Sequence, residues 1–167
     1  MCYNENWGAD KGPANDGKEE SGMDERIRRH AECLAREGRL DELRRFRQHG
    51  AVSVYDHSMD VAATALRLSR ALRLRVDEDS LIRGALLHDY FLYDWHVRDR
   101  ERPLHGFYHP KAALQNARRD YRVNVREADI IGRHMFPLTP LPPRTREGLL
   151  VCFADKLCAL RETFVRR

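Results

Sequence analysis

The sequence predicts an all-α fold, a single domain of about six to seven helices. Apolar residues recur at spacings of three and four in one segment after another, as they do on the buried face of a helix. No stretch of the sequence shows the strict alternation of a half-buried strand. At 167 residues the chain has the length of one domain, which can bury a sizeable core without disulfides.

Seven segments carry the helical pattern. The expected helices span 24–37, 40–48, 57–74, 77–89, a segment opening at His109-Pro110, 126–134 and 144–165. Asp77 is the expected N-cap of the fourth helix, and Asp56 or Ser53 would cap the third. Proline is favoured in the first turn of a helix, so we expect His109 at a helix N-terminus. The core stripe expected for the last helix is Leu149, Leu150, Phe153, Leu157 and Leu160.

Residues 1–22 differ in composition from residues 23–167, which we assign to the domain. They are rich in Gly, Asn, Asp, Lys and Glu and lack periodic apolar residues, so we expect a disordered leader. Tyr3 and Trp7 are its aromatic exceptions, and docking of these two residues on the domain is the alternative. The leader has no apolar signal-peptide region, and no apolar run of the sequence reaches the ~20 residues that span a bilayer.

Charge and cysteine content indicate a cytoplasmic protein without a membrane or nucleic-acid partner. The net charge of +4 is mildly basic and favours anionic substrates. The sequence has no basic tract interleaved with aromatic residues suited to base stacking, so nucleic-acid binding is not expected. The four cysteines are Cys2, Cys33, Cys152 and Cys158, and none of them forms a CxxC pair. We expect all four to be reduced thiols, with Cys152 and Cys158 packed in the core.

The stretch Gly84-Ala85-Leu86-Leu87-His88-Asp89 carries the first chemical signal. Its apolar helical run ends abruptly in an imidazole and a carboxylate. Burying such groups is unfavourable unless they are paired or bind a metal, and a histidine beside an aspartate is a natural metal-binding couple. His57 upstream and Asp155 downstream are also potential ligands in apolar helical surroundings.

This order of residues resembles the HD superfamily of metal-dependent phosphohydrolases, over roughly residues 49–164. The surrounding phrases match as well: an Ala-rich helix after His57, "ALLHD" at the central pair and "ADKL" at Asp155. The resemblance implies a helical HD domain in which one metal ion is held by His57, His88, Asp89 and Asp155.

Two further histidines, His109 and His134, fall between the second and last ligand positions. Some HD families carry two such histidines and hold two metals, so the resemblance implies a second ion on His109 and His134, with Asp89 bridging. Two adjacent ions can clamp both oxygens of a phosphoryl displacement. Mixed histidine and carboxylate ligands favour two divalent transition-metal ions, iron or manganese first, with zinc, cobalt or nickel as alternatives.

The remaining candidates are substrate contacts and proton donors. His96 and His105 lie in the aromatic, turn-rich segment 90–108, which either lines a pocket or covers the core, and either histidine could protonate the leaving group. The expected phosphate contacts are Lys111, Arg133 and Lys156. The chain departs from many HD hydrolases at Leu92, where those relatives have Lys or Glu. No Gly-Tyr-Pro triplet follows His109, which argues against the HD-GYP enzymes.

The sequence therefore predicts hydrolysis of a phosphate ester by a metal-activated hydroxide. Nucleotides, cyclic nucleotides and small phosphorylated metabolites all fit as substrates, and no oligomeric state is indicated. Two alternatives use the same residues: an HD-type di-iron oxygenase, and a non-catalytic nucleotide-binding HD protein.

Overall fold

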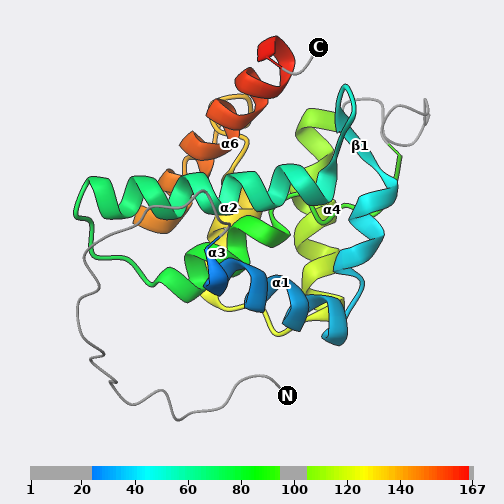
Figure 1. The fold of residues 1–167 in the computed structure, drawn as a ribbon, viewed down its shortest axis with the longest axis horizontal. Coiled ribbons are helices and arrows are strands. Elements are labelled where there is room, and N and C mark those ends of the chain that lie inside the picture. Colours follow the sequence, from blue (N-terminus) through cyan, green and yellow to red (C-terminus); the bar gives the residue numbers. More distant parts are fainter. Residues whose placement is uncertain (1–23, 95–104, 166–167) are drawn as a thin grey trace.

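The structure is a computed structural model that describes residues 24–94 and 105–165. These residues form six α-helices, one 3₁₀ helix and one short hairpin, which confirms the all-α prediction (Figure 1). None of the described helices is long and apolar enough to cross a membrane. The elements are α1 (Glu25–Glu37), η1 (Leu40–Arg45), β1 (Arg47–His49), β2 (Val52–Ser53), α2 (Val54–Ala71), α3 (Glu78–Leu87), α4 (His105–Asp120), α5 (Val125–Arg133) and α6 (Arg146–Val165).

Polar residues cap four of the helices. Asp24 and Ser53 accept backbone N–H groups at the starts of α1 and α2, and Asp77 caps α3 as predicted. Asn124 and Glu127 form a reciprocal capping box at the start of α5. These caps satisfy N–H groups that have no partner within the helix, so they fix where each helix begins.

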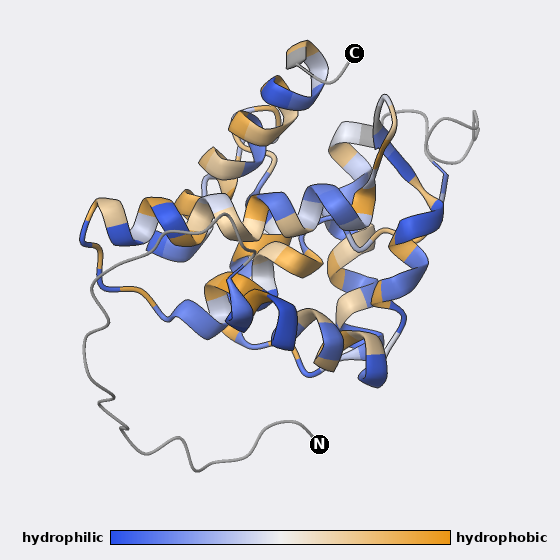
Figure 2. Ribbon diagram, in the orientation of Figure 1, coloured by the Kyte–Doolittle hydropathy of each residue, from blue (hydrophilic) through white to orange (hydrophobic). Residues whose placement is uncertain are grey.

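The centre of the bundle is α3, which packs between α2 and α5 (Figure 1). Every residue from Ser80 to Leu87 is buried. A Cβ at Gly84 would lie 2.3 Å from Cδ1 of Ile130, so glycine allows α5 to approach α3 this closely. Figure 2 shows apolar segments gathered in the middle of the bundle and polar segments around it.

Tyr90 ties the segment after α3 to α1 and α4. Its hydroxyl accepts the Arg39 N–H at 3.0 Å and donates to Asp120 at 2.9 Å. Burial raises the pKa of Tyr90, so the hydroxyl keeps its proton. Asn116 of α4 donates to the carbonyls of Tyr90 and Phe91 at 3.1 and 2.9 Å. The backbone beside His88-Asp89 is therefore held from two sides.

Asp129 fixes the connection from α5 to α6. Its carboxylate accepts the N–H groups of Arg144 and Thr145 and the Thr145 hydroxyl, at 2.8–3.1 Å. This anchor sets where α6 starts relative to the end of α5. The arrangement matters because both helices contribute predicted ligands.

Three expected boundaries are wrong. The helix expected over 40–48 ends at Arg45, and the chain then forms the antiparallel β1–β2 hairpin, which turns at Gly50 with φ 58°. The fourth helix ends at Leu87, with His88 as its C-cap. Helix α4 starts at His105, so Pro110 lies inside it and His109 is one turn beyond the N-terminus. The reason for expecting Lys111 to bind phosphate at a helix N-terminus is lost with that boundary.

The core stripe expected for α6 is also wrong. Leu150 is buried, but Leu149, Phe153, Leu157 and Leu160 are 40–57 % exposed. The buried face instead carries Val151, Ala154, Asp155, Cys158 and Glu162. The helix is apolar on both faces, and the partners of its buried carboxylates decide which face turns inward. Cys152 and Cys158 are buried and free, as expected, while Cys33 is half-buried. The predicted leader lies outside the described residues.

The close contact at Gly84 predicts that Ile130→Ala lowers the free energy of unfolding by about 2–4 kcal/mol, because it leaves a cavity between α3 and α5. Urea denaturation measures the change. Val125→Ala is the control on the same helix, since Val125 is 85 % exposed, and should change stability by no more than about 0.5 kcal/mol. Equal effects of the two substitutions would contradict the packing described.

Candidate metal centre

The six predicted ligands converge from five segments of the chain, and all six are buried. They lie on α2 (His57), at the end of α3 (His88 and Asp89), on α4 (His109), at the end of α5 (His134) and on α6 (Asp155). The bundle thus brings together residues that are up to 98 positions apart in the sequence.

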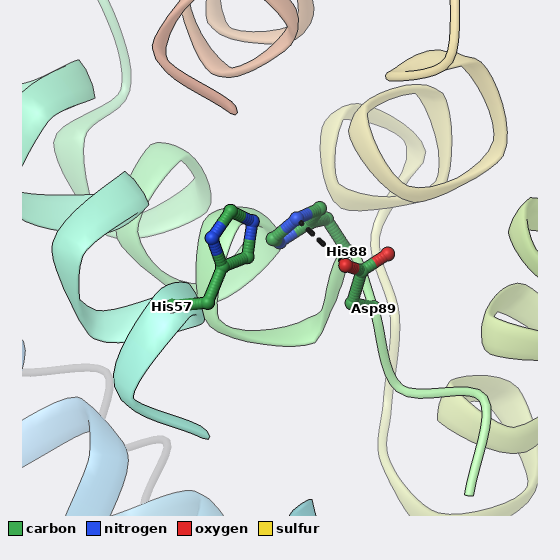
Figure 3. Close-up of side chains that lie close together, drawn as sticks. All are labelled: His57, His88 and Asp89. Carbon is green, nitrogen blue, oxygen red and sulfur yellow. Dashed lines mark ion pairs between the residues drawn. The ribbon is translucent and has the colours of Figure 1, made fainter. Parts of the chain in front are cut away.

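The first part of the cluster is formed by His57, His88, Asp89 and Asp155. Nε2 of His57 lies 3.1 Å from Oδ1 of Asp155, and Nε2 of His88 lies 3.8 Å from the same oxygen. Nε2 of His88 is 3.4 Å from Oδ2 of Asp89. Figure 3 shows the two imidazoles side by side and the Asp89 carboxylate next to His88. Ligand atoms of His57, His88 and Asp89 all lie within 4.8 Å of one another, a spacing that one ion can span.

The second part is formed by the other oxygen of Asp89 with His109 and His134. Oδ1 of Asp89 lies 3.2 Å from Nε2 of His109 and 3.4 Å from Nε2 of His134. The two Nε2 atoms are 2.8 Å apart. Each oxygen of Asp89 thus faces a different histidine environment, with His88 on one side and His109 and His134 on the other.

Hydrogen bonds fix which nitrogen each ring presents. Nδ1 of His88 donates to the Ala85 carbonyl at 2.7 Å, and Nδ1 of His134 donates to the Ile131 carbonyl at 2.9 Å. A neutral imidazole that donates from Nδ1 leaves the Nε2 lone pair free to bind a metal. Both Nε2 atoms face the cluster: that of His88 has no hydrogen-bond partner within the described structure, and that of His134 lies against Nε2 of His109.

The donor set fits divalent cations. His88 Nε2 and Asp89 Oδ1 are buried and have no hydrogen-bond partner within the described structure. Burial alone would raise the pKa of Asp89, but the neighbouring His88, His109 and His134 hold it well below its usual range. Burial alone would also raise the pKa of Asp155, but the hydrogen bond from His57 and the nearby imidazole of His88 keep it low. The cluster therefore combines two ionised carboxylates with imidazoles that can bind a metal in their neutral form. Transition metals prefer such a mixed set of ligands.

A cavity of about 560 Å³ opens over the cluster. Its floor includes Asp89, His109, His134 and Asp155. Much of its wall is apolar, formed by Met135, Pro137, Leu138 and Ala159. A space of this size accommodates a small organic molecule with one polar end against the cluster.

The predicted cations differ in their relation to this cavity. Lys156 lines it, but its ammonium donates to the His134 carbonyl at 2.9 Å and the Cys152 carbonyl at 3.1 Å, so it also braces α5 against α6. Arg133 donates to the Pro142 carbonyl and pairs with Asp129, outside the described lining of the cavity. Lys111 is exposed and does not belong to that lining either.

The predicted proton donors lie at the edge of what the structure describes. His96 is outside the described residues, and His105 starts α4 with a side chain that is not described. Leu92, which stands where many HD hydrolases have Lys or Glu, is half-buried against the core with φ 55°. It is not among the described residues that line the cavity.

Two polar residues that touch the cluster were not found from the sequence. Gln48 of β1 lines the cavity and donates from Nε2 to Oδ2 of Asp89 at 2.7 Å. The hairpin that carries it has no clear sequence signal. Glu162 of α6 contacts His57, and its signal was available: it follows Asp155 by seven residues, which places both on one face of a helix.

A family model described as HD domain matches residues 54–160. The chain belongs to the HD-domain family. The match confirms the resemblance to HD proteins from which the order of the ligands was predicted. Most members of this family are metal-dependent hydrolases. No significant match was found among curated proteins or among solved structures.

The charge pairs of the cluster predict that the metal-free protein loses stability as the pH rises above about 6.5, through the raised pKa values of His57 and His88. Burial opposes protonation of His57 and His88, but Asp155 and Asp89 raise both pKa values above 6.5, and Glu162 adds to the effect on His57. Their stabilising protons are fully bound below the unfolded pKa and are lost as the pH rises through the folded pKa. His134, whose pKa burial lowers, is neutral in both states above pH ~7 and does not oppose the trend.

Urea denaturation in the presence of a chelator, at stepped pH, measures this dependence. His57→Gln should flatten the profile, because the ring with the most strongly raised pKa is removed. A wild-type profile that is level or rises over this range would show that the histidines are not held protonated by the carboxylates.

Proposed function

We propose that this HD-domain protein is a metal-dependent phosphohydrolase that cleaves the phosphate ester of a nucleotide or another small metabolite. The observation that carries the proposal is the shared Asp89 carboxylate, which faces His88 with one oxygen and His109 and His134 with the other. The cluster lies at the floor of an open cavity, where a phosphoryl group can reach it. Two adjacent ions are the arrangement that suits phosphoryl displacement.

In this proposal His57, His88, Asp89 and Asp155 hold one divalent ion, and Asp89, His109 and His134 hold a second. When bound, such ions supply positive charge to the phosphoryl oxygens and acidify water. We propose iron or manganese for both ions, because the ligands are a mixture of nitrogen and oxygen atoms.

The chain's other residues shape the reaction around these ligands. Gln48 holds Asp89 in place through its 2.7 Å hydrogen bond. The apolar wall formed by Met135, Pro137 and Leu138 keeps bulk water from the organic part of the substrate. Lys156 is the proposed phosphate contact, because it lines the cavity beside Asp155. His105, next to the cavity-lining Gly106, and His96 are the proposed donors of a proton to the leaving oxygen.

The proposal predicts two metal ions per chain and phosphate release that depends on them. Asp89→Ala should remove both ions, because it removes the bridge, whereas His109→Ala should leave about one ion on the remaining ligands. Loss of several kcal/mol of electrostatic stabilisation should lower the turnover of each variant by roughly 10²–10³-fold. Elemental analysis and phosphate release from a panel of nucleotides and phosphomonoesters measure these effects.

His30→Ala is the matched control, because His30 pairs with Asp79 near α1 and takes no part in the cluster. It should keep both ions and full turnover. The panel is run with and without O₂. Metal-loaded protein that consumes O₂ and releases no phosphate anaerobically would support an oxygenase instead. Metal or ligand binding without any turnover would support a non-catalytic binder.

A further inference from the structure

Glu162 is a buried carboxylate next to the metal centre that the ligand set does not use. Its side chain is completely inaccessible to solvent. It lies on α6 seven residues after Asp155, about two helical turns away on the same face. A buried carboxylate is unfavourable unless its partners compensate for lost hydration, so its contacts indicate why it is there.

The imidazole of His57 lies between these two carboxylates of α6. Nδ1 of His57 is 3.0 and 3.1 Å from the two oxygens of Glu162, and Nε2 is 3.1 Å from Oδ1 of Asp155. The other buried glutamates serve the fold: Glu127 pairs with Arg83, and Glu147 accepts the Asp77 N–H. Within the described structure the Glu162 carboxylate has hydrogen bonds to His57 alone.

The position of His57 in its helix explains why an outside acceptor is needed. His88 and His134 are C-cap residues, and each donates from Nδ1 to a carbonyl three residues earlier. Carbonyls in the last turn of a helix have no intrahelical partner, so they are free to accept. His57 is the fourth residue of α2, where the helix continues and its own N–H groups use those carbonyls.

We propose that Glu162 is a positioning residue for the metal centre. It accepts the Nδ1–H of His57 and thereby leaves the Nε2 lone pair on the side of the cluster, where it would be available to an ion. A carboxylate behind a ligating histidine also makes the ring a stronger donor. This inference rests on the metal site of the proposed function.

Zinc affinity, measured by competition with a chelating dye, tests the inference on the full chain. Glu162→Ala should weaken binding about 10- to 100-fold, because the ring loses its orienting partner. Glu162→Gln should weaken it less, since the amide oxygen still accepts the Nδ1–H. The matched control is Glu147→Gln, another buried glutamate of α6, which should leave the affinity unchanged.

Long-range ¹H–¹⁵N spectra of the zinc-loaded protein give a second readout that a purely structural role would not change. Wild type and Glu162→Gln should show the His57 Nδ1–H as a slowly exchanging proton, because an acceptor shields it from water, whereas Glu162→Ala should lose this signal through exchange. Unchanged affinity and an unchanged Nδ1–H signal in Glu162→Ala, in protein that binds zinc, would overturn this inference alone. A wild-type protein that binds no metal would overturn the metal site and this inference together.

The outer face of α6 carries an independent signal. Five large apolar side chains on it are 40–75 % exposed: Leu149, Phe153, Leu157, Leu160 and Phe164. Spacings of four, four, three and four residues place them in one stripe, which we call the α6 stripe. The C-terminal half of α6 extends beyond the body of the bundle, so the stripe is accessible (Figure 1).

The extent and symmetry of the α6 stripe favour a second copy of this chain as its partner. At roughly 150–250 Å² for an aromatic side chain and somewhat less for leucine, the stripe exposes on the order of 500 Å². Two stripes face to face would bury about 1,000 Å², the lower limit for a specific interface. The spacing is nearly the same in reverse, so antiparallel pairing about Leu157 sets Leu149 against Phe164 and Phe153 against Leu160. Such a two-fold contact closes on itself.

We propose that the protein forms a homodimer through the α6 stripe. Sedimentation equilibrium of the full chain should give a dimer, and Leu160→Glu should give a monomer with unchanged helix content, because it places a charge in the apolar contact. Val125→Glu, at a more exposed apolar site on α5, should remain dimeric. A wild-type monomer at micromolar concentration would overturn the proposal, as would a dimer that survives Leu160→Glu. The first result would mean that another partner or the N-terminal residues cover the stripe.

Discussion

The buried carboxylate of Asp89 determines how the helices around it are arranged. It is 2 % exposed, and its two oxygens face different histidines. An isolated charge at such a depth is strongly unfavourable, so the fold has to supply compensating groups from several directions at once. Helices α3, α4 and α5 place His88, His109 and His134 beside this carboxylate, and these imidazoles compensate for its lost hydration.

Helix ends do much of this work. His88 and His134 are C-cap residues, where the carbonyls of the last turn are free to accept a proton from Nδ1. The same hydrogen bond that completes the helix therefore selects the tautomer that a metal ligand needs. Gly84 lets α5 approach α3, and the Tyr90 and Asn116 contacts hold the backbone after the His88-Asp89 pair.

The sequence predicted the parts that depend on local patterns. Helical periodicity and caps such as Asp77 depend on residues that are close together in the sequence. The ligand order depends on a family motif. All three could therefore be found without knowledge of the fold. The hairpin carrying Gln48 could not, because two short strands bury few residues and leave no alternating pattern. The predicted start of α4 is wrong for a different reason. Proline is favoured in the first turn of a helix, which predicts a start near Pro110, but the helix continues upstream to His105.

The orientation of α6 shows what hydrophobicity alone does not decide. Its two faces are both apolar enough to be buried, and the larger side chains of the α6 stripe favour burial by area. Asp155 and Glu162 reverse that preference, because both lie on the other face and contact the two ring nitrogens of the buried His57. A buried imidazole between two carboxylates fixes the rotation of the helix, and the exposed apolar stripe is the consequence. Polar groups that must find partners in the core can thus determine which apolar residues are left for the surface.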